Sequence, residues 1–205
     1  MTVAIIDYGM GNLGSVRRAV EECGHAVFIT DEPEDLFEVE KIILPGVGAY
    51  RDGMRQLYEG GWIAPIEKAV NEEKIPLLGI CLGMQLLANK SYENGTFDGL
   101  RLIPGEVRKL EPSEGFHERV PHVGWNGIEN IIDHPLLEDI PEGTDFYFVH
   151  SYHFCPKDTA HVLATTEYCG SFVSVVGYEN VMGTQFHPEK SSRPGRKVLH
   201  NFLRI

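Results

Sequence analysis

A cysteine flanked by glycines is the strongest chemical signal in this sequence. Cys81 follows an apolar run and precedes a helical pattern, in the order Leu77-Leu78-Gly79-Ile80-Cys81-Leu82-Gly83-Met84-Gln85. Glycines on both sides of a nucleophile permit the strained strand-to-helix turn called a nucleophile elbow. The N-terminus of the following helix favours thiolate over thiol. The run therefore predicts a cysteine nucleophile, and the alternative is a buried cysteine that packs as a small apolar group.

Two residues that follow Cys81 are placed to assist such a nucleophile. The backbone amide of Leu82 is predicted to point to the position where an oxyanion would form. Gln85 lies one helical turn further on and is predicted to share an exposed face with Cys81.

A second glycine cluster, Pro45-Gly46-Val47-Gly48, ends another predicted strand. In a doubly wound sheet this strand would neighbour the one that ends at Cys81, so the amide of Val47 would supply a second oxyanion donor. Removing one such donor typically costs about 3 kcal/mol of transition-state stabilisation. The alternative is a plain turn in which glycine supplies a positive φ.

A thiolate nucleophile needs a base, and the base needs a group that orients it. The run Thr184-Gln185-Phe186-His187-Pro188-Glu189 contains both. Pro188 disfavours helix at His187 and so predicts an extended segment, in which Glu189 lies on the same side as His187. The run thus indicates a Cys81–His187–Glu189 arrangement, although His-Pro-Glu on its own is more typical of a surface turn.

The remaining cysteines and the His-x-x-His pair give weaker signals. Cys23, Cys155 and Cys169 are far apart and predict neither a disulfide framework nor a zinc site, so we expect them to pack as small apolar residues. His150 and His153 have no carboxylate or cysteine companion, and we expect no metal there.

The elements that must position these groups follow a β-α-β-α order in the first half of the chain. Apolar runs at 3–6, 26–29, 41–44 and 77–80 predict strands, and helical patterns follow the first and the third of them. This order predicts an α/β fold with a doubly wound, mainly parallel sheet. Helices would cover both faces, and ligands would bind at the carboxyl ends of the strands.

From about residue 107 the apolar runs shorten and are interrupted by Gly and Pro. They predict antiparallel strands added to the sheet, at 120–123, 146–149, 161–165, 173–176 and 181–185. The stretch 196–205 predicts a closing helix. Because no repeat, low-complexity tract or linker is present, the sequence predicts one domain over residues 1–205.

Composition narrows the classes of function. The chain has 30 Asp and Glu against 18 Lys and Arg, and this net charge of −12 argues against nucleic-acid binding and against an anionic membrane surface. The N-terminus lacks the pattern of a signal peptide. The uncharged stretch 75–89 is shorter than the roughly 20 residues of a membrane span. We therefore expect a cytoplasmic protein.

Together the three motifs resemble those of the triad class (class I) of glutamine amidotransferases, with Cys81 and His187 in the same order and 187 − 81 = 106 residues apart. Within that class, residues 1 to about 200 resemble the glutaminase subunits of imidazole glycerol phosphate synthases. Five runs carry this likeness: Asp7-Tyr8-Gly9-Met10-Gly11-Asn12-Leu13, Gly46-Val47-Gly48-Ala49, Pro121-His122-Val123-Gly124-Trp125-Asn126, Tyr147-Phe148-Val149-His150-Ser151-Tyr152 and His187-Pro188-Glu189-Lys190-Ser191.

The resemblance implies a flavodoxin-like class I glutamine amidotransferase domain that needs no cofactor and no metal. It also implies the chemistry. Cys81 would attack the side-chain amide of glutamine and form a γ-glutamyl thioester. His187, oriented by Glu189, would protonate the departing ammonia and then activate water.

The same resemblance assigns the binding residues. Amides of Val47 and Leu82 would bind the oxyanion, and Gly46 and Gly48 would let their strand approach the site. Gln85 would help to hold glutamine. The glycines would also let a peptide of the 45–48 strand flip between a donor-out and a donor-in form.

A partner is implied as well, because the 205 residues are expected to hold no domain for the acceptor substrate. In this family it is a (β/α)8-barrel cyclase subunit, which uses the ammonia to make imidazole glycerol phosphate and an aminoimidazole carboxamide ribotide in histidine biosynthesis. Trp125, Tyr147 and Lys190 match positions that face this partner. Ordinary packing is the alternative for Trp125 and Tyr147.

Three other functions stay open at this level. A glutaminase subunit of anthranilate or aminodeoxychorismate synthase would share the elbow and His-Pro-Glu, but not the Tyr-Gly-Met-Gly-Asn and Gly-Trp-Asn runs. A non-catalytic scaffold is disfavoured by the presence of Cys81, His187 and Glu189. A stress-type cysteine hydrolase of the same broad fold would not be expected to contain Gln-Phe-His-Pro-Glu.

Overall fold

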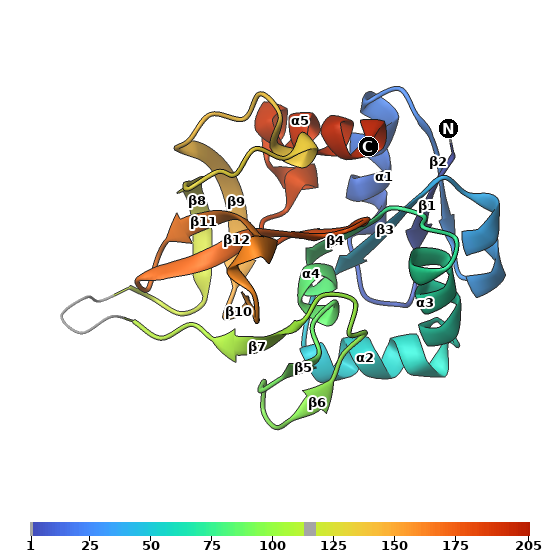
Figure 1. The fold of residues 1–205 in the computed structure, drawn as a ribbon, viewed down its shortest axis with the longest axis horizontal. Coiled ribbons are helices and arrows are strands. Elements are labelled where there is room, and N and C mark those ends of the chain that lie inside the picture. The colour runs from blue at the N-terminus through green and yellow to red at the C-terminus, as the bar shows by residue number, and fades with distance from the viewer. Residues whose placement is uncertain (1, 113–117) are drawn as a thin grey trace.

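A seven-stranded sheet forms the centre of the computed structural model, which describes residues 2–112 and 118–205 (Figure 1). The strand order is β11-β12-β13-β4-β3-β1-β2. Parallel pairing joins β1 (Thr2–Ile6), β2 (Ala26–Thr30), β3 (Lys41–Gly46), β4 (Leu77–Cys81) and β13 (Val181–Thr184). Antiparallel pairing adds β11 (Val162–Glu167) and β12 (Ser171–Tyr178) at one edge. The predicted α/β fold with a mainly parallel sheet and added antiparallel strands is confirmed.

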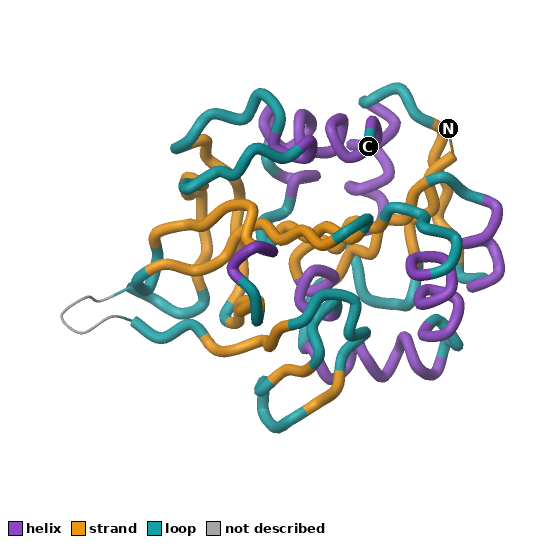
Figure 2. The backbone as a smooth tube through the Cα atoms, viewed as in Figure 1, coloured by secondary structure: helices purple, strands orange, loops and turns teal. Residues whose placement is uncertain are grey.

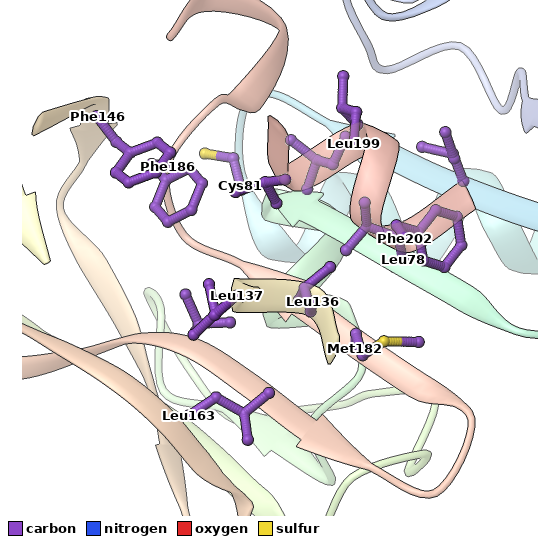
Figure 3. Close-up of a cluster of buried hydrophobic side chains, with 14 of the residues drawn as sticks. Leu78, Cys81, Leu136, Leu137, Phe146, Leu163, Met182, Phe186, Leu199 and Phe202 are labelled. Atoms are coloured by element: carbon purple, nitrogen blue, oxygen red, sulfur yellow. The ribbon is translucent and has the colours of Figure 1, made fainter. Parts of the chain in front are cut away.

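Helices cover both faces of this sheet (Figures 1 and 2). One face carries α1 (Leu13–Glu22) and α5 (Ser192–Arg204), and the other carries α2 (Tyr50–Glu59), α3 (Ile63–Asn71) and the short α4 (Leu82–Leu86). Strand side chains alternate between the two cores: Val3 and Ile5 pack on the α1/α5 side, and Ala4 and Ile6 on the α2/α3 side. Figure 3 shows part of the core on the α1/α5 side, with Cys81 between Phe186 and Leu199 in this view.

The second half of the chain departs from the prediction in its strand pairing. The runs at 120–123 and 146–149 do not extend the main sheet, because β8 (His122–Ile128) and β9 (Thr144–His150) form a separate two-stranded antiparallel ribbon. The run at 181–185 is antiparallel to β12 but parallel to β4. An apolar run indicates a strand but not its neighbour, since pairing depends on contacts far apart in the sequence.

Several elements were not predicted. The region 50–71 contains two helices rather than one stretch, because Gly61 adopts a positive φ of 72° between them. A four-stranded sheet is built from β10 (Tyr152–Pro156), β7 (Gly105–Lys109), β5 (Lys90–Ser91) and β6 (Phe97–Asp98). Short 3₁₀ turns lie at Pro33–Glu38, Pro135–Leu137, Thr159–His161 and Pro188–Lys190. Such short elements leave too little sequence for a periodic pattern.

The strand β3 continues through Pro45 and Gly46, where the sequence predicted it to stop. Ile42 donates its N–H to the carbonyl of Pro76 on the β4 side, so strand alternation turns the nitrogen of Pro45 toward β1. The pairing of β1 with β3 ends at Ile43. The N–H that Pro45 lacks is therefore not needed there.

Two further predictions concern the whole chain. In the structure, Cys23, Cys81, Cys155 and Cys169 are free thiols. The single domain over residues 1–205 stays a prediction. Across 2–112 and 118–205, the structure has no helix with the length and apolar character that crossing a membrane requires.

A glycine at the start of α4 provides a test of the packing. A Cβ on Gly83 would collide with the carbonyl oxygen of Leu44 in β3. We expect Gly83→Ala to lower the free energy of unfolding by about 1–3 kcal/mol, the usual effect of adding atoms to a packed interior. Gly14→Ala in α1 is the matched control, because no atom lies within 4 Å of the added Cβ. It should raise stability by about 0.5–1 kcal/mol. Urea denaturation measures the free energy of unfolding of both variants. Equal values for Gly83→Ala and Gly14→Ala would show that a Cβ at Gly83 does not disturb the packing.

Candidate active site

The backbone at Cys81 is strained. Its φ is 54° and its ψ is −108°, at the junction between β4 and α4. A non-glycine residue held in such a conformation costs about 1–3 kcal/mol, and strain of this kind clusters at functional sites. The flanking glycines permit the turn, since a Cβ on Gly79 would lie 2.7 Å from the carbonyl oxygen of Gly83. The predicted strand, sharp turn and helix are therefore present around the cysteine.

His187 and Glu189 form a buried pair. The Nδ1 atom of His187 lies 2.8 Å from Oε1 of Glu189, and the two side chains are 2% and 1% exposed. Because an ionised carboxylate only accepts hydrogen bonds, the imidazole donates from Nδ1. The Nε2 atom of His187 is then left buried with no partner among the described residues, in position to exchange a proton with a reacting group.

The segment after His187 differs from the prediction. His187 itself is extended, as predicted from Pro188 (φ −95°, ψ 96°), but Pro188–Lys190 is a 3₁₀ turn, closed by a hydrogen bond from the amide of Lys190 to the carbonyl of His187 (3.0 Å). Pro188 suits the first position of such a turn because its φ is already fixed near the required value. The contact between His187 and Glu189 was predicted, but the backbone that makes it was not.

The pKa of His187 is raised from its ordinary value of 6.5 to about 9. Burial alone would lower this pKa, because it penalises the charged form. The nearby, negatively charged Cys81 and the hydrogen bond and charge of Glu189 together outweigh burial and stabilise the imidazolium. A histidine that holds a proton next to a cysteine is the arrangement that sustains a thiolate nucleophile.

One cavity of about 400 Å³ brings most of the predicted site residues together. Its walls include Val47, Gly48, Cys81, Leu82, Gln85, Glu93, Pro121, Val149, His150, Ser151, Tyr152 and His187. Gly46 pairs in register with Cys81, so β3 and β4 end side by side at the cavity. Glu189 lies behind His187 and does not line it. The sulfur of Cys81 is directed to the side of Phe186 in Figure 3.

Gln85 lines the cavity, but the prediction of an exposed face was wrong. Its side chain is buried, and its Nε2 donates to the carbonyl of Tyr152 (2.8 Å) and to Oε1 of Gln185 (3.0 Å). The helical spacing placed Gln85 on the correct side of α4. Its burial follows from the second half of the chain, which packs over that side and which helical spacing does not describe.

Glu93 is a wall residue that the sequence did not single out. It lies in the loop after β5, and one of its carboxylate oxygens accepts a hydrogen bond from the first backbone amide of α2 (2.8 Å). No motif marks Glu93, because only the packing of this loop against α2 brings it to the cavity.

His150, considered only as a metal ligand from the sequence, also lines the cavity. Its Nδ1 lies 2.9 Å from the carbonyl oxygen of Tyr152, and its Nε2 lies 3.2 Å from Nδ1 of His122. A carbonyl only accepts, so His150 carries its proton on Nδ1 and His122 donates to Nε2. Burial lowers the pKa of His150 to about 3 and that of His122 to about 4, so both are neutral at pH 7.

This histidine pair stiffens the cavity wall. The carbonyl of Tyr152 receives hydrogen bonds from both His150 and Gln85. The pairing arises from the ribbon register, in which His122 lies opposite His150, and no local signal in the sequence could reveal it. In the part of the chain that the structure describes, no group of three or more His, Cys, Asp or Glu is placed to hold a metal ion.

Comparison with known proteins assigns the family. The model of the family "Glutamine amidotransferase class-I" matches residues 4–205. The chain belongs to the class-I glutamine amidotransferase family. The resemblance predicted from the three motifs is thus confirmed, as is the prediction of an enzyme of this kind. The roles of the individual site residues stay predictions.

Relatives of this class-I glutamine amidotransferase include two proteins named imidazole glycerol phosphate synthase subunit HisH. The protein from Moorella thermoacetica is 48% identical over 200 residues, which cover 98% of this chain and 93% of that protein. The protein from Syntrophotalea carbinolica is 45% identical over 203 residues, or 98% of each chain. The solved structure of PurLQS from Thermotoga maritima is 20% identical, with a TM-score of 0.74 over 99% of this chain and 97% of that chain, and so supports the fold alone.

Beside the cavity, this glutamine amidotransferase exposes one side of the β8–β9 ribbon. Four residues on that side, Val123, Trp125, Tyr147 and Val149, are here called the aromatic face. Trp125 is 53% exposed and Val123 57% exposed, and the rings of Trp125 and Tyr147 pack edge to face with centroids 6.0 Å apart. Nζ of Lys190 lies 6.0 Å from the centroid of the Tyr147 ring. The three residues predicted to meet a partner therefore lie together.

The His187 pair generates a titration prediction for this glutamine amidotransferase. We expect Glu189→Gln to lower the pKa of His187 by about one pH unit or more, because the carboxylate supplies both a hydrogen bond and a negative charge to the imidazolium. The ¹⁵N chemical shifts of the imidazole, followed against pH, measure it. Glu179→Gln removes an exposed carboxylate paired with Lys74 and should leave this pKa unchanged. An unchanged pKa in Glu189→Gln would contradict the role of the carboxylate.

Proposed function

We propose that this chain is the glutaminase subunit of an imidazole glycerol phosphate synthase. In this function it hydrolyses glutamine to glutamate and ammonia for histidine biosynthesis, in the cytoplasm, with neither nucleic acid nor a membrane involved. The observation that carries the proposal is that Cys81, the His187–Glu189 pair and the ends of β3 and β4 meet at one cavity. The full-length similarity to the HisH subunits, at 45–48% identity, supports the same function.

The geometry supports a two-step reaction through Cys81. The sulfur attacks the carbonyl carbon of the side-chain amide of glutamine, and the carbonyl oxygen becomes an oxyanion. His187 then gives its proton from Nε2 to the amide nitrogen, which leaves as ammonia and leaves a γ-glutamyl thioester. In the second step His187 takes a proton from water. The resulting hydroxide attacks the thioester, releasing glutamate and the thiolate of Cys81.

Backbone amides and side chains of the cavity are proposed to bind different parts of glutamine. The amides of Leu82 and Val47 are the proposed oxyanion donors. The absence of a Cβ at Gly46 lets its strand lie close to the elbow, because a Cβ there would be 2.8 Å from Cβ of Leu82, whereas Gly48 supplies a φ of 107°. The carboxylate of Glu93 is suited to pair with the α-ammonium group of glutamine, since charge-assisted hydrogen bonds are the strong ones.

Gln85 is the proposed side-chain contact for the bound substrate. Its amide nitrogen is already occupied by Tyr152 and Gln185, so its orientation is set before glutamine arrives. A binding group that is ordered in advance loses less conformational freedom when the ligand binds.

The ammonia has to reach an acceptor before solvent protonates it, because ammonium is not a nucleophile. We propose that the aromatic face docks on a (β/α)8-barrel cyclase subunit. That subunit would use the ammonia to form imidazole glycerol phosphate and an aminoimidazole carboxamide ribotide. Val149 belongs both to this face and to the cavity wall, so a partner seated here would cover the mouth of the site. Exposed apolar patches beside a cavity are typical of interaction surfaces.

The nucleophile gives the direct test of the function. In the complex with the cyclase subunit, Cys81→Ala should lower glutamine-dependent synthesis on the order of 10⁴-fold or more, while synthesis from added ammonium salts persists. Cys155→Ala is the control, because Cys155 is also a free thiol but is only partly buried and lies outside the cavity. Loss of ammonium-dependent synthesis in Cys81→Ala would instead assign Cys81 to structure or to the interface.

The aromatic face gives a test of the partner. We expect Trp125→Ala to weaken association with the cyclase subunit at least about tenfold, because buried tryptophans contribute strongly to interfaces. Activation of the glutaminase by the cyclase should weaken in parallel. Tyr58→Ala is the control, since Tyr58 is 78% exposed on α2, away from this face. Titration calorimetry and glutamate release measure the two effects. Equal affinity of the two variants would place the interface elsewhere.

A further inference from the structure

The hydroxyl of Tyr8 is a buried polar group that the proposed mechanism leaves unused. Tyr8 follows β1 and is 4% exposed, and its Oη atom has no hydrogen-bond partner in residues 2–112 and 118–205. Buried hydroxyls in proteins are nearly always hydrogen-bonded. The hydroxyl of Tyr8 can therefore gain a hydrogen bond if a neighbouring carbonyl group turns toward it.

This hydroxyl lies against the backbone of Gly46. A Cβ on Gly46 would be 2.6 Å from Oη of Tyr8, and 2.8 Å from both the backbone nitrogen of Gly83 and Cβ of Leu82. Gly46 thus occupies the space between the Tyr8 hydroxyl and the first turn of α4. Burial, together with negative charge on Cys81, raises the pKa of Tyr8 well above its ordinary value of 10, so the phenol keeps its proton.

The strand order determines where the carbonyl of Gly46 can turn. Ile42 bonds toward β4, and alternation along β3 directs the N–H and C=O of Gly46 toward β4 as well. A half-turn of the Gly46–Val47 peptide would direct the Val47 amide toward β4 and Cys81, and the Gly46 carbonyl toward the β1 side. On that side β1 pairing has already ended at Ile43, and Tyr8 is the residue that follows the strand by two positions.

We propose that Tyr8 is a positioning residue for the oxyanion hole. Its hydroxyl donates a hydrogen bond to the carbonyl oxygen of Gly46 when the peptide turns the amide of Val47 toward Cys81. The inference rests on the proposed glutaminase function, because it requires an oxyanion at Cys81. The bond gives the buried hydroxyl its missing partner and so favours the donor-in form, without contact between Tyr8 and glutamine.

Tyr8→Phe tests the proposal in the full chain bound to its cyclase partner. We expect kcat for glutamine hydrolysis to fall at least tenfold while KM changes less than twofold, because glutamine does not touch the hydroxyl. An aldehyde analogue of glutamine, which places an oxygen at the oxyanion position when it adds to Cys81, should lose affinity by a factor similar to that of kcat. Binding of glutamine itself, measured in the Cys81→Ala background, should not change.

Tyr50→Phe is the matched control. The hydroxyl of Tyr50 is likewise buried and has no partner among the described residues, but it lies against Gly99, away from the cavity. Its kcat and its affinity for the aldehyde should stay within twofold of the unaltered protein. The melting temperature of both variants should be no lower than that of the unaltered protein, because neither substitution breaks a hydrogen bond of the resting fold.

Each other outcome overturns the proposal. Unchanged kcat and aldehyde affinity in Tyr8→Phe would refute the role of Tyr8 but would leave the proposed glutaminase function unaffected. A raised KM at constant kcat would make Tyr8 a substrate-binding residue. A melting temperature lower than that of Tyr50→Phe would show that the hydroxyl is bonded in the resting protein. If the unaltered complex does not hydrolyse glutamine, the proposed function fails and this inference fails with it.

Discussion

The backbone of β3 is in direct contact with the backbone of the first turn of α4, and there is no room for a side chain between them. Gly83 packs on the carbonyl of Leu44, and Gly46 lies opposite Cys81 in the sheet register. This close approach holds the end of β3 beside the elbow, so that Val47 and Gly48 line the same cavity as Cys81. The proposed oxyanion hole depends on this contact, because donors on one strand and a nucleophile on the next can act together only at a separation of a few ångströms.

His187 is buried, and burial by itself disfavours a charged side chain. Burial disfavours an imidazolium, yet His187 keeps a proton because Cys81 and Glu189 stabilise its charged form. On the other wall, His150 and His122 have no such partners, and burial keeps both neutral. One cavity thus contains two histidines in opposite charge states. The neighbours decide the difference, since every histidine begins from the same ordinary pKa.

The β8–β9 ribbon connects the cavity to the molecular surface. Alternation along each strand directs His122 and His150 inward and Trp125 and Val149 outward. The inner side fixes the carbonyl of Tyr152 and, through it, Gln85. The outer side forms the aromatic face. The ribbon reaches the cavity through His150 of its inner side and Val149 of its outer side, so a partner at the proposed docking surface would contact an element of the cavity wall.

The sequence by itself determined the local features of this protein. Glycines around Cys81 predicted the elbow, and the β-α-β-α order predicted the parallel sheet. Pro188 predicted the extended conformation of His187, although the contact with Glu189 is made through a 3₁₀ turn. These signals are local, because backbone conformation at a glycine or proline depends mainly on the residue and its neighbours.

Only the tertiary structure decided which elements meet. It paired β8 with β9 instead of adding them to the main sheet, buried Gln85, and brought Glu93, His150 and Tyr8 to the site from segments without a motif. An apolar run specifies that a strand will be buried but not against which partner. Strand pairing depends on the register and packing of the whole chain. His122 and His150 are neighbours only because β8 pairs with β9 in this register.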